Sequence, residues 1–560
     1  MHHGNHAEHD GNGHAAHTPG TVVPPPSAEP IVPLLRLWLF FGVIFLTLYA
    51  YWSAPMIGPR SQALCGIFVI IGLVALFSRN LARVSWRPLF FGFGLQILFA
   101  IFILKFEITG MEGLGIPDGF RPGHELFRWI AQGLTMFLAF GHKGMEFVFG
   151  VLVSQEKMRD IFGRGTGPVF AFSVLPTLIF VSSFFSVLYY FGILQVVVRL
   201  ISRVMMKLLG TSGAETLSVL ADVFMGAAEA PLIIKPFISR MTTSELLALM
   251  VGGMATISGS LMAVYIGFGA DPVAILVTSF MAAPASLYLS KLLIPETEIP
   301  VTHHSVKTVE DTQHRNVLDA VAGGAAEGMH QALNIAAMLI AFIGLVTLID
   351  ASLRYFPTNT SLPEWLGSSY GWDAVRKYAC TMLWFVAAAY VLRWPFRAFL
   401  KTLDWEHHFT AWKKSTWFIR LGPTLLAYFL FMGVLDVLMR KLPTNLTLGE
   451  IFANVFYPLA ILMGVEPADA GKVASLLGTK LTTNEFVAFL DLSNLAPQLS
   501  QRSFLLATYA LTGFANFAAV GIQLGSIAAL APERRAEVAR LGPWALFVGF
   551  LVTILNASIA

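Results

Sequence analysis

The feature that most constrains this chain is a series of long apolar runs, each near the length that crosses a lipid bilayer. Only 13% of the residues are charged and 56% are hydrophobic, whereas a soluble domain carries about 25% charged residues. A helix needs roughly 20 apolar residues to span the hydrocarbon core. Eleven runs approach that length and predict an all-α integral membrane protein with about eleven transmembrane helices. The predicted spans are 33–53, 62–78, 88–105, 166–192, 245–268, 272–292, 336–352, 377–394, 416–438, 502–528 and 542–559.

The distribution of Lys and Arg predicts how the chain is oriented in a cell (inner) membrane. Basic residues gather in the loop at 79–87, in an amphipathic surface stretch at 193–209, in the loop at 395–415 and at 534–540. If all eleven runs cross the bilayer, these four segments fall on one side, and the positive-inside rule places that side in the cytoplasm. The N-terminus is then cytoplasmic and the C-terminus outside. A net charge of +3 is too small to indicate nucleic-acid binding.

Residues 1–30 form a His-rich tail whose polar composition predicts disorder. Its histidines have no fixed ligand spacing, so a dedicated metal site is the less favoured interpretation. The same residues lack the pattern of a cleavable signal peptide. Cys65 and Cys380 both lie in apolar runs and are expected to be small core residues rather than a disulfide.

Two further apolar stretches, 215–239 and 470–492, are interrupted by glycine and charged residues. In the first, Asp222 and Glu229 have apolar neighbours, and each charge costs about 2.5–3.5 kcal/mol at the bilayer centre. Such a segment favours a re-entrant hairpin, which is two half-helices whose tip is buried in protein at mid-membrane. Acids inside the membrane are typical of functional sites. For Asp222 the structural alternative is an ion pair with Lys235.

The second stretch carries Glu485, for which a capping box with Thr482 is the structural alternative. Each hairpin is followed by a helix that small and polar residues interrupt, and Thr242-x-x-Glu245 is expected to cap the first of these. The order hairpin, broken helix and span thus occurs twice, with the first hairpin entering from the cytoplasm and the second from outside. Transporters built from such inverted repeats bind substrate and ion at the midplane, where broken helices expose backbone groups and helix ends. The two interruptions are at 252–260 and 513–521.

Short motifs occur in one characteristic order along the chain. They are Glu146-Phe147-Val148-Phe149-Gly150, Glu229-Ala230-Pro231-Leu232 with Lys235-Pro236, the segment 253–259, Leu333-Asn334-Ile335-Ala336-Ala337-Met338-Leu339-Ile340, Gly478-Thr479-Lys480 with Asn484-Glu485-Phe486-Val487-Ala488, Gly513-Phe514-Ala515-Asn516-Phe517 and Leu530-Ala531-Pro532. Together they resemble the concentrative nucleoside transporter family, over most of 62–350 and 448–560. The resemblance implies a homotrimeric secondary symporter that takes up nucleosides with Na⁺ or H⁺, by alternating access of a domain that contains the hairpins.

The resemblance also implies which residues bind the ligands. In the family the acid of each hairpin and the Asn of the last broken helix hold the nucleoside, which here are Glu229, Glu485 and Asn516, with Phe514 lining the site. The coupling cation, Na⁺ or H⁺, lies between the first hairpin tip and the first broken helix. The hydroxyl groups at that position have the structural alternative of bonding their own helix. The matching cation positions are Asp222, Met225, Thr256, Ile257 and Ser258.

Four positions depart from the pattern of the family. Ala227 and Ala228 stand where the family usually has Gln-Thr, whose side chains contact the base. Ala519 stands where a Ser near the ribose is common. Asp222 replaces the family's Asn in the cation site, and its carboxylate either strengthens cation binding or lets protons drive uptake. The transport fold is therefore expected to be retained, while the substrate is a nucleoside of different preference or another polar solute.

Three other interpretations compete with a nucleoside symporter. A divergent family member carrying another polar solute is the first, and a membrane protein that binds a ligand without moving it is the second, although a receptor needs no inverted repeat. A membrane enzyme is disfavoured, because the intramembrane polar residues contain no catalytic triad, metal-ligand pair or phosphate loop. The predicted organisation is a cytoplasmic tail at 1–30, an extra N-terminal helix at 31–55, scaffold helices at 56–192, a first transport repeat at 193–292, a scaffold helix at 318–352, an inserted helix pair at 353–447 and a second transport repeat at 448–560.

Overall fold

The computed structural model describes residues 31–109, 119–154, 158, 161, 170–173, 175–227, 230–302, 315–354 and 447–560. Within these residues the chain is helical apart from short connections and an isolated β-bridge between Ile108 and Phe120. The all-α class expected from the apolar runs is therefore confirmed. The predictions for the tail at 1–30, for Cys380 and for the inserted spans 377–394 and 416–438 lie outside the described residues. Cys65 is a free thiol.

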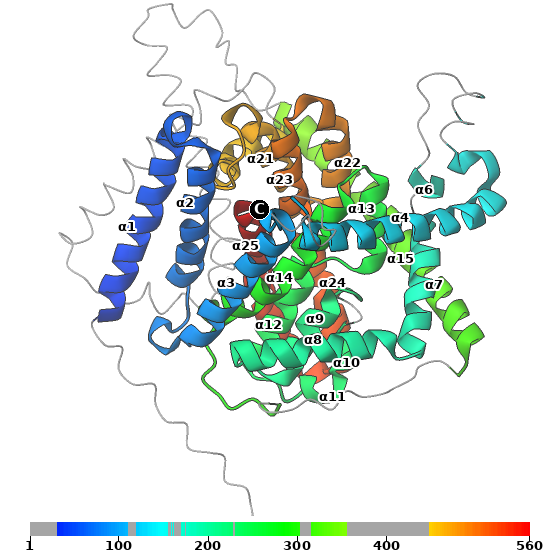
Figure 1. The fold of residues 1–560 in the computed structure, drawn as a ribbon, viewed down its shortest axis with the longest axis horizontal. Helices are drawn as coiled ribbons and strands as arrows, with labels where there is room; N and C mark the ends of the chain where they lie inside the picture. Colours follow the sequence, from blue (N-terminus) through cyan, green and yellow to red (C-terminus); the bar gives the residue numbers. More distant parts are fainter. Residues whose placement is uncertain are drawn as a thin grey trace, which may run out of the picture.

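The N-terminal part contains three apolar helices, a long crosswise helix and a bent pair (Figure 1). The bend between the last two helices is 73°, and Gly192 between them has φ 73°, a conformation that glycine adopts without strain. The elements are α1 (Ile31–Trp52), α2 (Ala54–Leu76), η1 (Leu81–Arg83), α3 (Trp86–Ala100), η2 (Ile101–Lys105), α4 (Pro122–Phe149), η4 (Gly150–Val153), α6 (Phe170–Ser173), α7 (Thr177–Tyr190) and α8 (Ile193–Leu209).

Two units that share the order hairpin, divided helix and unbroken helix follow, separated by the long helix α15 (Val317–Arg354). The first unit is α9 (Gly213–Asp222), α10 (Ala230–Ile233), α11 (Lys235–Ile238), α12 (Thr243–Ala255), α13 (Gly259–Gly267) and α14 (Pro272–Leu293). The second is α19 (Leu448–Val455), α20 (Tyr457–Leu462), α21 (Pro467–Thr482), α22 (Glu485–Leu495), η6 (Ala496–Gln498), α23 (Gln501–Leu511), α24 (Phe517–Leu530), η7 (Pro532–Arg534) and α25 (Arg535–Ile559).

The two units are inverted relative to each other. In Figure 1 the first hairpin, α9 to α11, lies toward the lower end of the molecule, and the second, α21 and α22, lies at the upper end. Each hairpin is followed by a helix in two pieces, α12 with α13 and α23 with α24, and then by an unbroken helix, α14 or α25. This is the arrangement that the repeated order of hairpin and broken helix predicts.

Five helices in the described residues are long and apolar enough to cross a membrane, or up to six with the bent pair α7 and α8. The sequence predicts about eleven spans, and two of these lie outside the described residues. The predicted spans 245–268 and 502–528 are each divided, because the backbone leaves the helix at 256–258 and at 512–516. These divided helices are what the small and polar interruptions indicate.

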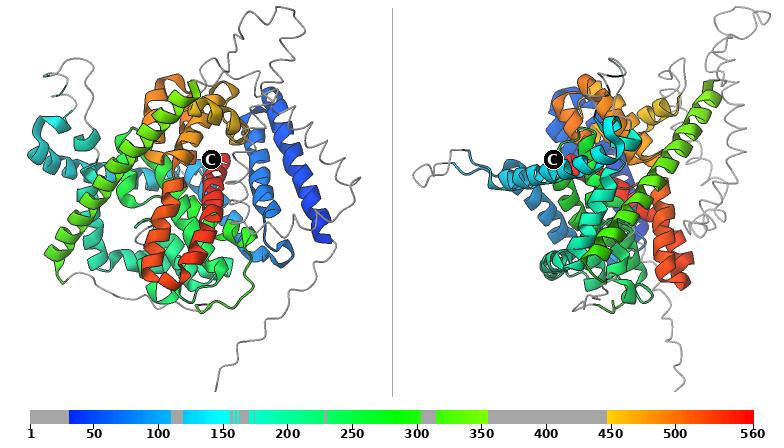
Figure 2. Two further views of the ribbon diagram at one scale, coloured as in Figure 1. Left: turned by 180° about the vertical axis from the view of Figure 1, so that it is seen from behind. Right: turned by 90° about the vertical axis from the view of Figure 1, so that its right-hand side faces the viewer.

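α4 is a finding that the apolar runs do not predict. It is long and apolar enough to cross a membrane. In both Figure 1 and the right-hand view of Figure 2, however, it lies crosswise to α1 and α2. Its mixed composition alternates exposed apolar and polar residues, and a few of its residues are buried on one side. Gly123, Phe127 and Ala131, spaced by four, belong to that buried side.

Three of the four predicted basic segments gather at the end where the first hairpin enters. Arg87 donates from Nη2 to the carbonyl oxygen of Lys207 over 2.7 Å, which joins the start of α3 to the end of α8. Arg534 donates to the carbonyl oxygen of Met241 over 2.7 Å, beside the base of the first hairpin. The fourth segment, 395–415, lies outside the described residues. The charge pattern therefore agrees with the arrangement of the helices that the structure describes.

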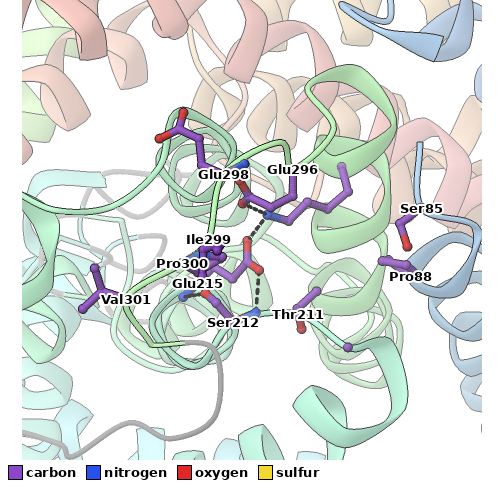
Figure 3. Close-up of a pocket in the computed structure, with 12 residues that line it drawn as sticks. Ser85, Pro88, Thr211, Ser212, Glu215, Glu296, Glu298, Ile299, Pro300 and Val301 are labelled. Atoms are coloured by element: carbon purple, nitrogen blue, oxygen red, sulfur yellow. Dashed lines mark hydrogen bonds and ion pairs between the residues drawn. The ribbon is translucent and has the colours of Figure 1, made fainter. Parts of the chain in front are cut away.

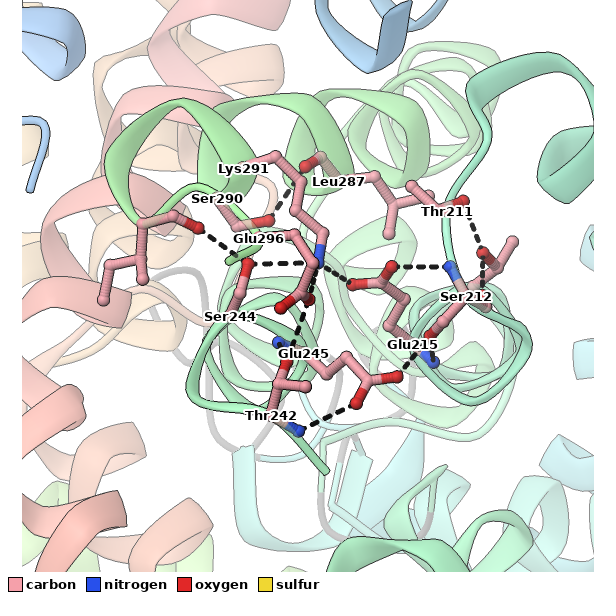
Figure 4. A network of polar contacts seen from close by, with 12 residues as sticks. Thr211, Ser212, Glu215, Thr242, Ser244, Glu245, Leu287, Ser290, Lys291 and Glu296 are labelled. Atoms are coloured by element: carbon pink, nitrogen blue, oxygen red, sulfur yellow. Dashed lines mark hydrogen bonds and ion pairs between the residues drawn. The ribbon is translucent and has the colours of Figure 1, made fainter. Parts of the chain in front are cut away.

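A buried polar network fixes the base of the first hairpin (Figure 4). Lys291, near the end of α14, has its Nζ 2.7 Å from Oε2 of Glu215 and 3.0 Å from Oε2 of Glu296. Glu215 closes a capping box at the start of α9, and Glu245 closes the predicted capping box with Thr242 at the start of α12. The network thereby joins the base of the hairpin, the first broken helix and the end of α14. The base of the hairpin is fixed by these contacts, and its tip lies outside the network.

Replacing Thr242 by alanine is expected to lower the free energy of unfolding by about 1–2 kcal/mol. Its hydroxyl accepts the backbone N–H of Glu245 over 3.1 Å and donates to Glu296 over 2.9 Å. Thermal unfolding in detergent measures the change. Thr347→Ala is the matched control, because the Thr347 hydroxyl bonds only its own helix at Ile343. Equal melting temperatures for Thr242→Ala and Thr347→Ala would contradict a stabilising role of the Thr242 hydroxyl.

Candidate functional site

The second hairpin brings Glu485 into contact with both broken helices. The side chain is fully buried at the N-terminus of α22, where the helix dipole favours a negative charge. Its Oε1 accepts the hydroxyl of Tyr265 on α13 over 2.9 Å, and its Oε2 accepts Nδ2 of Asn516 over 2.7 Å. Asn516 is itself the N-cap of α24. One carboxylate therefore joins the second hairpin to a residue from each repeat.

The capping alternative for Glu485 is wrong. Thr482 lies in the last turn of α21, and its hydroxyl donates to the carbonyl oxygen of Gly478 over 2.8 Å. The N-cap of α22 is Asn484, whose Oδ1 accepts the backbone N–H of Val487 over 3.0 Å. Glu485 therefore forms no capping box with Thr482, and its carboxylate contacts Tyr265 and Asn516.

A buried lysine lies behind this carboxylate. Lys480 on α21 is 0% exposed, and its Nζ donates to the carbonyl oxygen of Ala510 over 2.8 Å and to Oγ1 of Thr553 over 3.0 Å. Ala510 is in the last turn of α23, directly before the interruption that carries Asn516. Lys480 also interacts electrostatically with Glu485. The ammonium group therefore links the hairpin to the end of the helix that presents the amide.

The two broken helices contact each other at their interruptions. The backbone N–H of Phe514 donates to the carbonyl oxygen of Thr256 over 3.2 Å. Gly513 has φ 130°, and a Cβ there would stand 2.8 Å from the carbonyl oxygen of Ala255. Only glycine accommodates both this backbone conformation and this close approach. The backbone that carries the predicted cation residues thus adjoins the backbone that carries Phe514 and Asn516.

The first hairpin carries a buried carboxylate that no hydrogen bond satisfies. Asp222 is 1% exposed, and neither of its carboxylate oxygens has a hydrogen-bond partner among the described residues. Lys235 is exposed, so the ion pair considered from the sequence does not form. Oδ2 of Asp222 instead lies 2.8 Å from the point where a Cβ on Gly252 would stand. Buried carboxylates are normally paired or bound to a cation, and this one faces the last turn of α12.

The tip of the first hairpin touches the first interruption. The backbone N–H of Gly259 donates to the carbonyl oxygen of Phe224 over 3.1 Å, and a Cβ on Gly226 would stand 2.8 Å from Cβ of Ser258. The contact places the hairpin segment that carries Asp222 and Met225 against the interruption that carries Thr256, Ile257 and Ser258.

The two hydroxyl groups of this set bond their own chain segment. Thr256 donates to the carbonyl oxygen of Gly252 over 2.8 Å, and Ser258 accepts the backbone N–H of Leu261 over 3.3 Å as the N-cap of α13. The structural alternative considered for them is thus observed. Oγ of Ser258 lies 3.6 Å from the point where a Cβ on Gly226 at the hairpin tip would stand.

The other predicted substrate residues are partly buried, fully buried or outside the described residues. Phe514 is partly buried at the second interruption. Ala519 is fully buried on α24, and its backbone N–H donates to Oδ1 of Asn516 over 2.8 Å. Ala227 is partly buried at the first hairpin tip. Ala228 and Glu229 lie outside the described residues.

Three polar residues near these positions were not among the predicted site residues: Tyr265, Lys480 and Gln523. Tyr265 stacks on Phe489 with ring centroids 4.4 Å apart, which aligns its hydroxyl with the second hairpin. Tyr265 and Gln523 lie in largely apolar helices and Lys480 follows the apolar pair Leu476 and Leu477, and a buried polar group in such surroundings needs a partner. That signal is visible in the sequence, although the partner of each residue is distant along the chain.

An open pocket at the base of the first hairpin is not the candidate substrate site (Figure 3). It is lined by Ser85 of the loop before α3, by Glu215 and by the segment that follows α14, including Glu298. The carboxylate of Glu215 is already engaged by Lys291 and by the backbone of Ser212. In the described residues no group of three His, Cys, Asp or Glu side chains is arranged to hold a metal ion.

Family models match most of the chain. The family described as "Na+ dependent nucleoside transporter C-terminus" matches residues 274–380 and 410–560. "Nucleoside recognition" matches 171–272, and "Na+ dependent nucleoside transporter N-terminus" matches 65–152. An uncharacterized transporter of Haemophilus influenzae is 34% identical, over 89% of this chain and 96% of that protein. Sodium/nucleoside cotransporter 1 of Rattus norvegicus is 32% identical, over 94% of this chain and 68% of that protein.

Solved structures of one transporter match the fold. The structure of CNTnw in an inward-facing substrate-bound state has a TM-score of 0.67 and 31% identity, and the match covers 90% of this chain and 97% of that chain. A substituted CNTnw in an outward-facing state also has a TM-score of 0.67, with 30% identity and the same coverage. The likeness therefore extends to proteins captured on both sides of a transport cycle.

Proposed function

Since the chain belongs to the concentrative nucleoside transporter family, we propose that it takes up nucleosides by symport with Na⁺, through alternating access of its hairpin-containing units. This family consists of transporters rather than enzymes, and the chain is a multi-pass membrane protein. Relatives named as sodium/nucleoside cotransporters support both the substrate class and the cation. The inward-facing and outward-facing states of CNTnw support alternating access.

The observation that carries the proposal is the contact of Glu485 with Asn516 and Tyr265. A buried carboxylate and a carboxamide side by side offer paired acceptors and donors, which suit the hydroxyl groups of a ribose. Phe514 lies at the same interruption and offers an apolar surface. Glu229, Ala228 and Ala227 on the first hairpin and Ala519 on α24 complete the proposed substrate site. Another polar solute is the second candidate, favoured by the two alanines of the first hairpin.

We assign the coupling cation to the contact between the first hairpin tip and the first interruption. Na⁺ is a hard cation that prefers oxygen ligands, and the carboxylate of Asp222 is buried there without a hydrogen-bond partner in the described residues. Met225, Thr256, Ile257 and Ser258 complete the proposed cation set. Protons are the alternative coupling ion, since Asp222 is a titratable group.

Imposed gradients distinguish the two ions. In proteoliposomes, an inward Na⁺ gradient is expected to drive accumulation of radiolabelled uridine or adenosine, and a pH gradient alone is not. Asp222→Ala removes the negative charge from the cation site, and the Na⁺ concentration for half-maximal uptake is expected to rise by at least about tenfold. Uptake as a function of Na⁺ concentration measures the effect.

Asp319→Ala is the matched control, because Asp319 is exposed in the first turn of α15 and lies far along the chain from either hairpin. Its Na⁺ dependence should equal that of the wild type. Accumulation driven by a pH gradient without Na⁺, and lost in Asp222→Asn, would show that the proton is the coupling ion. Absence of uptake of both nucleosides by folded protein would overturn the nucleoside assignment and point to another polar solute.

We further propose that the subunits assemble as a homotrimer in the cell (inner) membrane, with the basic end of the bundle in the cytoplasm. The positive-inside rule supports this orientation, because Arg87 and Arg534 lie at the end where the first hairpin enters. The N-terminus is then cytoplasmic, which agrees with the bond from Arg36 at the start of α1 to the carbonyl oxygen of Ser78 at the same end. The C-terminus then lies outside.

A further inference from the structure

Gln523 is a buried carboxamide on the face of α24 that the proposed substrate site uses. It is 2% exposed and lies seven residues after Asn516, with Ala519 between them. Residues spaced by three, four and seven share one face of a helix, and Ala519, Gln523 and Ile527 are the buried residues of α24. At 1.5 Å per residue, Gln523 lies about 10 Å along the axis from Asn516.

Within the described residues, only the nitrogen atom of this carboxamide makes a hydrogen bond. Nε2 donates to the carbonyl oxygen of Met250 on α12 over 3.0 Å. A carbonyl oxygen can only accept, so this bond fixes which atom of the amide is nitrogen. Oε1 has no hydrogen-bond partner among the residues that the structure describes. A buried acceptor left without a donor costs about 1–3 kcal/mol, so the side chain is poised to accept a hydrogen bond from a ligand.

The carboxamide lies against the tip of the first hairpin. A Cβ on Gly253 would stand 2.3 Å from Nε2 of Gln523 and 2.7 Å from Cβ of Ala227. Two atoms so close to one point are neighbours, and the missing side chain at Gly253 makes room for both. The methyl group of Ala227 offers no hydrogen bond, so the polar group at this point of the hairpin tip is supplied by α24.

We propose that Gln523 determines substrate specificity by accepting a hydrogen bond from a ring N–H of the nucleobase. This inference rests on the proposed function, and it adds the class of base. The ribose would lie toward Glu485 and Asn516, and the base would lie two turns further along α24, against the hairpin tip. Oε1 of Gln523 can accept, and Nε2 has a second hydrogen besides the one donated to Met250. These two groups match the adjacent ring N–H and carbonyl of uracil or hypoxanthine. Nucleosides that lack this ring N–H leave Oε1 unsatisfied.

Methylated nucleosides test the proposal directly. In wild-type proteoliposomes, 3-methyluridine is expected to compete with radiolabelled uridine at least about tenfold less well than uridine itself, and 1-methylinosine correspondingly less well than inosine. In Gln523→Met, which keeps the length of the side chain without its polar atoms, the ratio for each pair is expected to fall below about threefold. The ratio compares two ligands on the same protein and is independent of the amount of protein that folds.

A second variant separates recognition from folding. Adding Ala227→Gln to Gln523→Met returns a carboxamide to the same point from the hairpin, and the discrimination between uridine and 3-methyluridine is expected to recover. Equal competition by uridine and 3-methyluridine in the wild type, or an unchanged ratio in Gln523→Met, overturns the role of Gln523 while leaving nucleoside transport in place. Failure of the wild type to transport uridine and inosine overturns the proposed function and this inference together.

Discussion

Replacing Glu485 by glutamine is expected to lower nucleoside uptake by about 100-fold or more. The change keeps the size of the side chain but replaces one carboxylate oxygen by an amide group. Glutamine then has a single acceptor oxygen, which cannot accept from both Tyr265 and Asn516. Each hydrogen bond to a charged group contributes about 1.5–3 kcal/mol, and about 1.4 kcal/mol corresponds to a factor of ten. One of the two bonds is lost and the other weakens because its acceptor is no longer charged, which together account for the expected factor. Initial rates of uridine uptake into proteoliposomes measure it.

Glu533→Gln is the matched control for this variant. Glu533 is exposed in η7, and the same change of charge there is expected to leave uptake within a factor of two. The amount of folded protein in the membrane is measured for both variants by size-exclusion chromatography in detergent. Uptake by folded Glu485→Gln within a factor of three of the wild type would show that this carboxylate does not hold the nucleoside.

Replacing Lys480 by methionine is expected to impair both stability and transport. The ammonium group is fully buried, and it bonds Ala510 and Thr553 while it offsets the charge of Glu485. Methionine leaves the carbonyl oxygen of Ala510 and Oγ1 of Thr553 without this buried donor, and each such loss costs about 1–3 kcal/mol. We therefore expect a lower melting temperature in detergent and loss of uridine uptake.

Lys472→Met tests the same substitution on the same helix. Lys472 lies two turns before Lys480 on α21, and its Nζ donates to the carbonyl oxygen of Gln498 at an exposed position. We expect its melting temperature and its uptake to stay close to those of the wild type. A double variant, Lys480→Met with Glu485→Gln, removes both charges and should recover part of the stability lost in Lys480→Met. No recovery would mean that the two charges do not stabilise each other.

The hairpins and the divided helices were predictable from composition, because glycine and acids interrupt long apolar runs there. Asp222 and Glu485 stand out for the same reason, since charges are costly inside a membrane. α4 was not predicted as a crosswise helix, because its apolar and polar residues alternate around the axis, and a search for continuous apolar runs passes over such a helix.

The partners of the polar side chains were beyond the sequence. Tyr265 and Glu485 are 220 residues apart, and Gln523 bonds a residue 273 positions away. Only the packing of the two inverted units against each other makes such pairs. Asp222 shows the converse, since the short spacing to Lys235 suggests an ion pair that the packing does not form. Local spacing therefore identifies which residues are chemically unusual, and tertiary contact decides which of them act together.

The backbone hydrogen bond between the two interruptions has a consequence for uncoupled cation movement. The N–H of Phe514 donates to the carbonyl oxygen of Thr256, and Gly513 allows this close approach. The segments proposed to hold the cation and the nucleoside are therefore directly hydrogen-bonded to each other. If a cation held at one segment tightens nucleoside binding at the other, thermodynamic linkage requires the nucleoside to tighten cation binding by the same factor. Such coupling disfavours the half-loaded forms and limits movement of the cation without substrate.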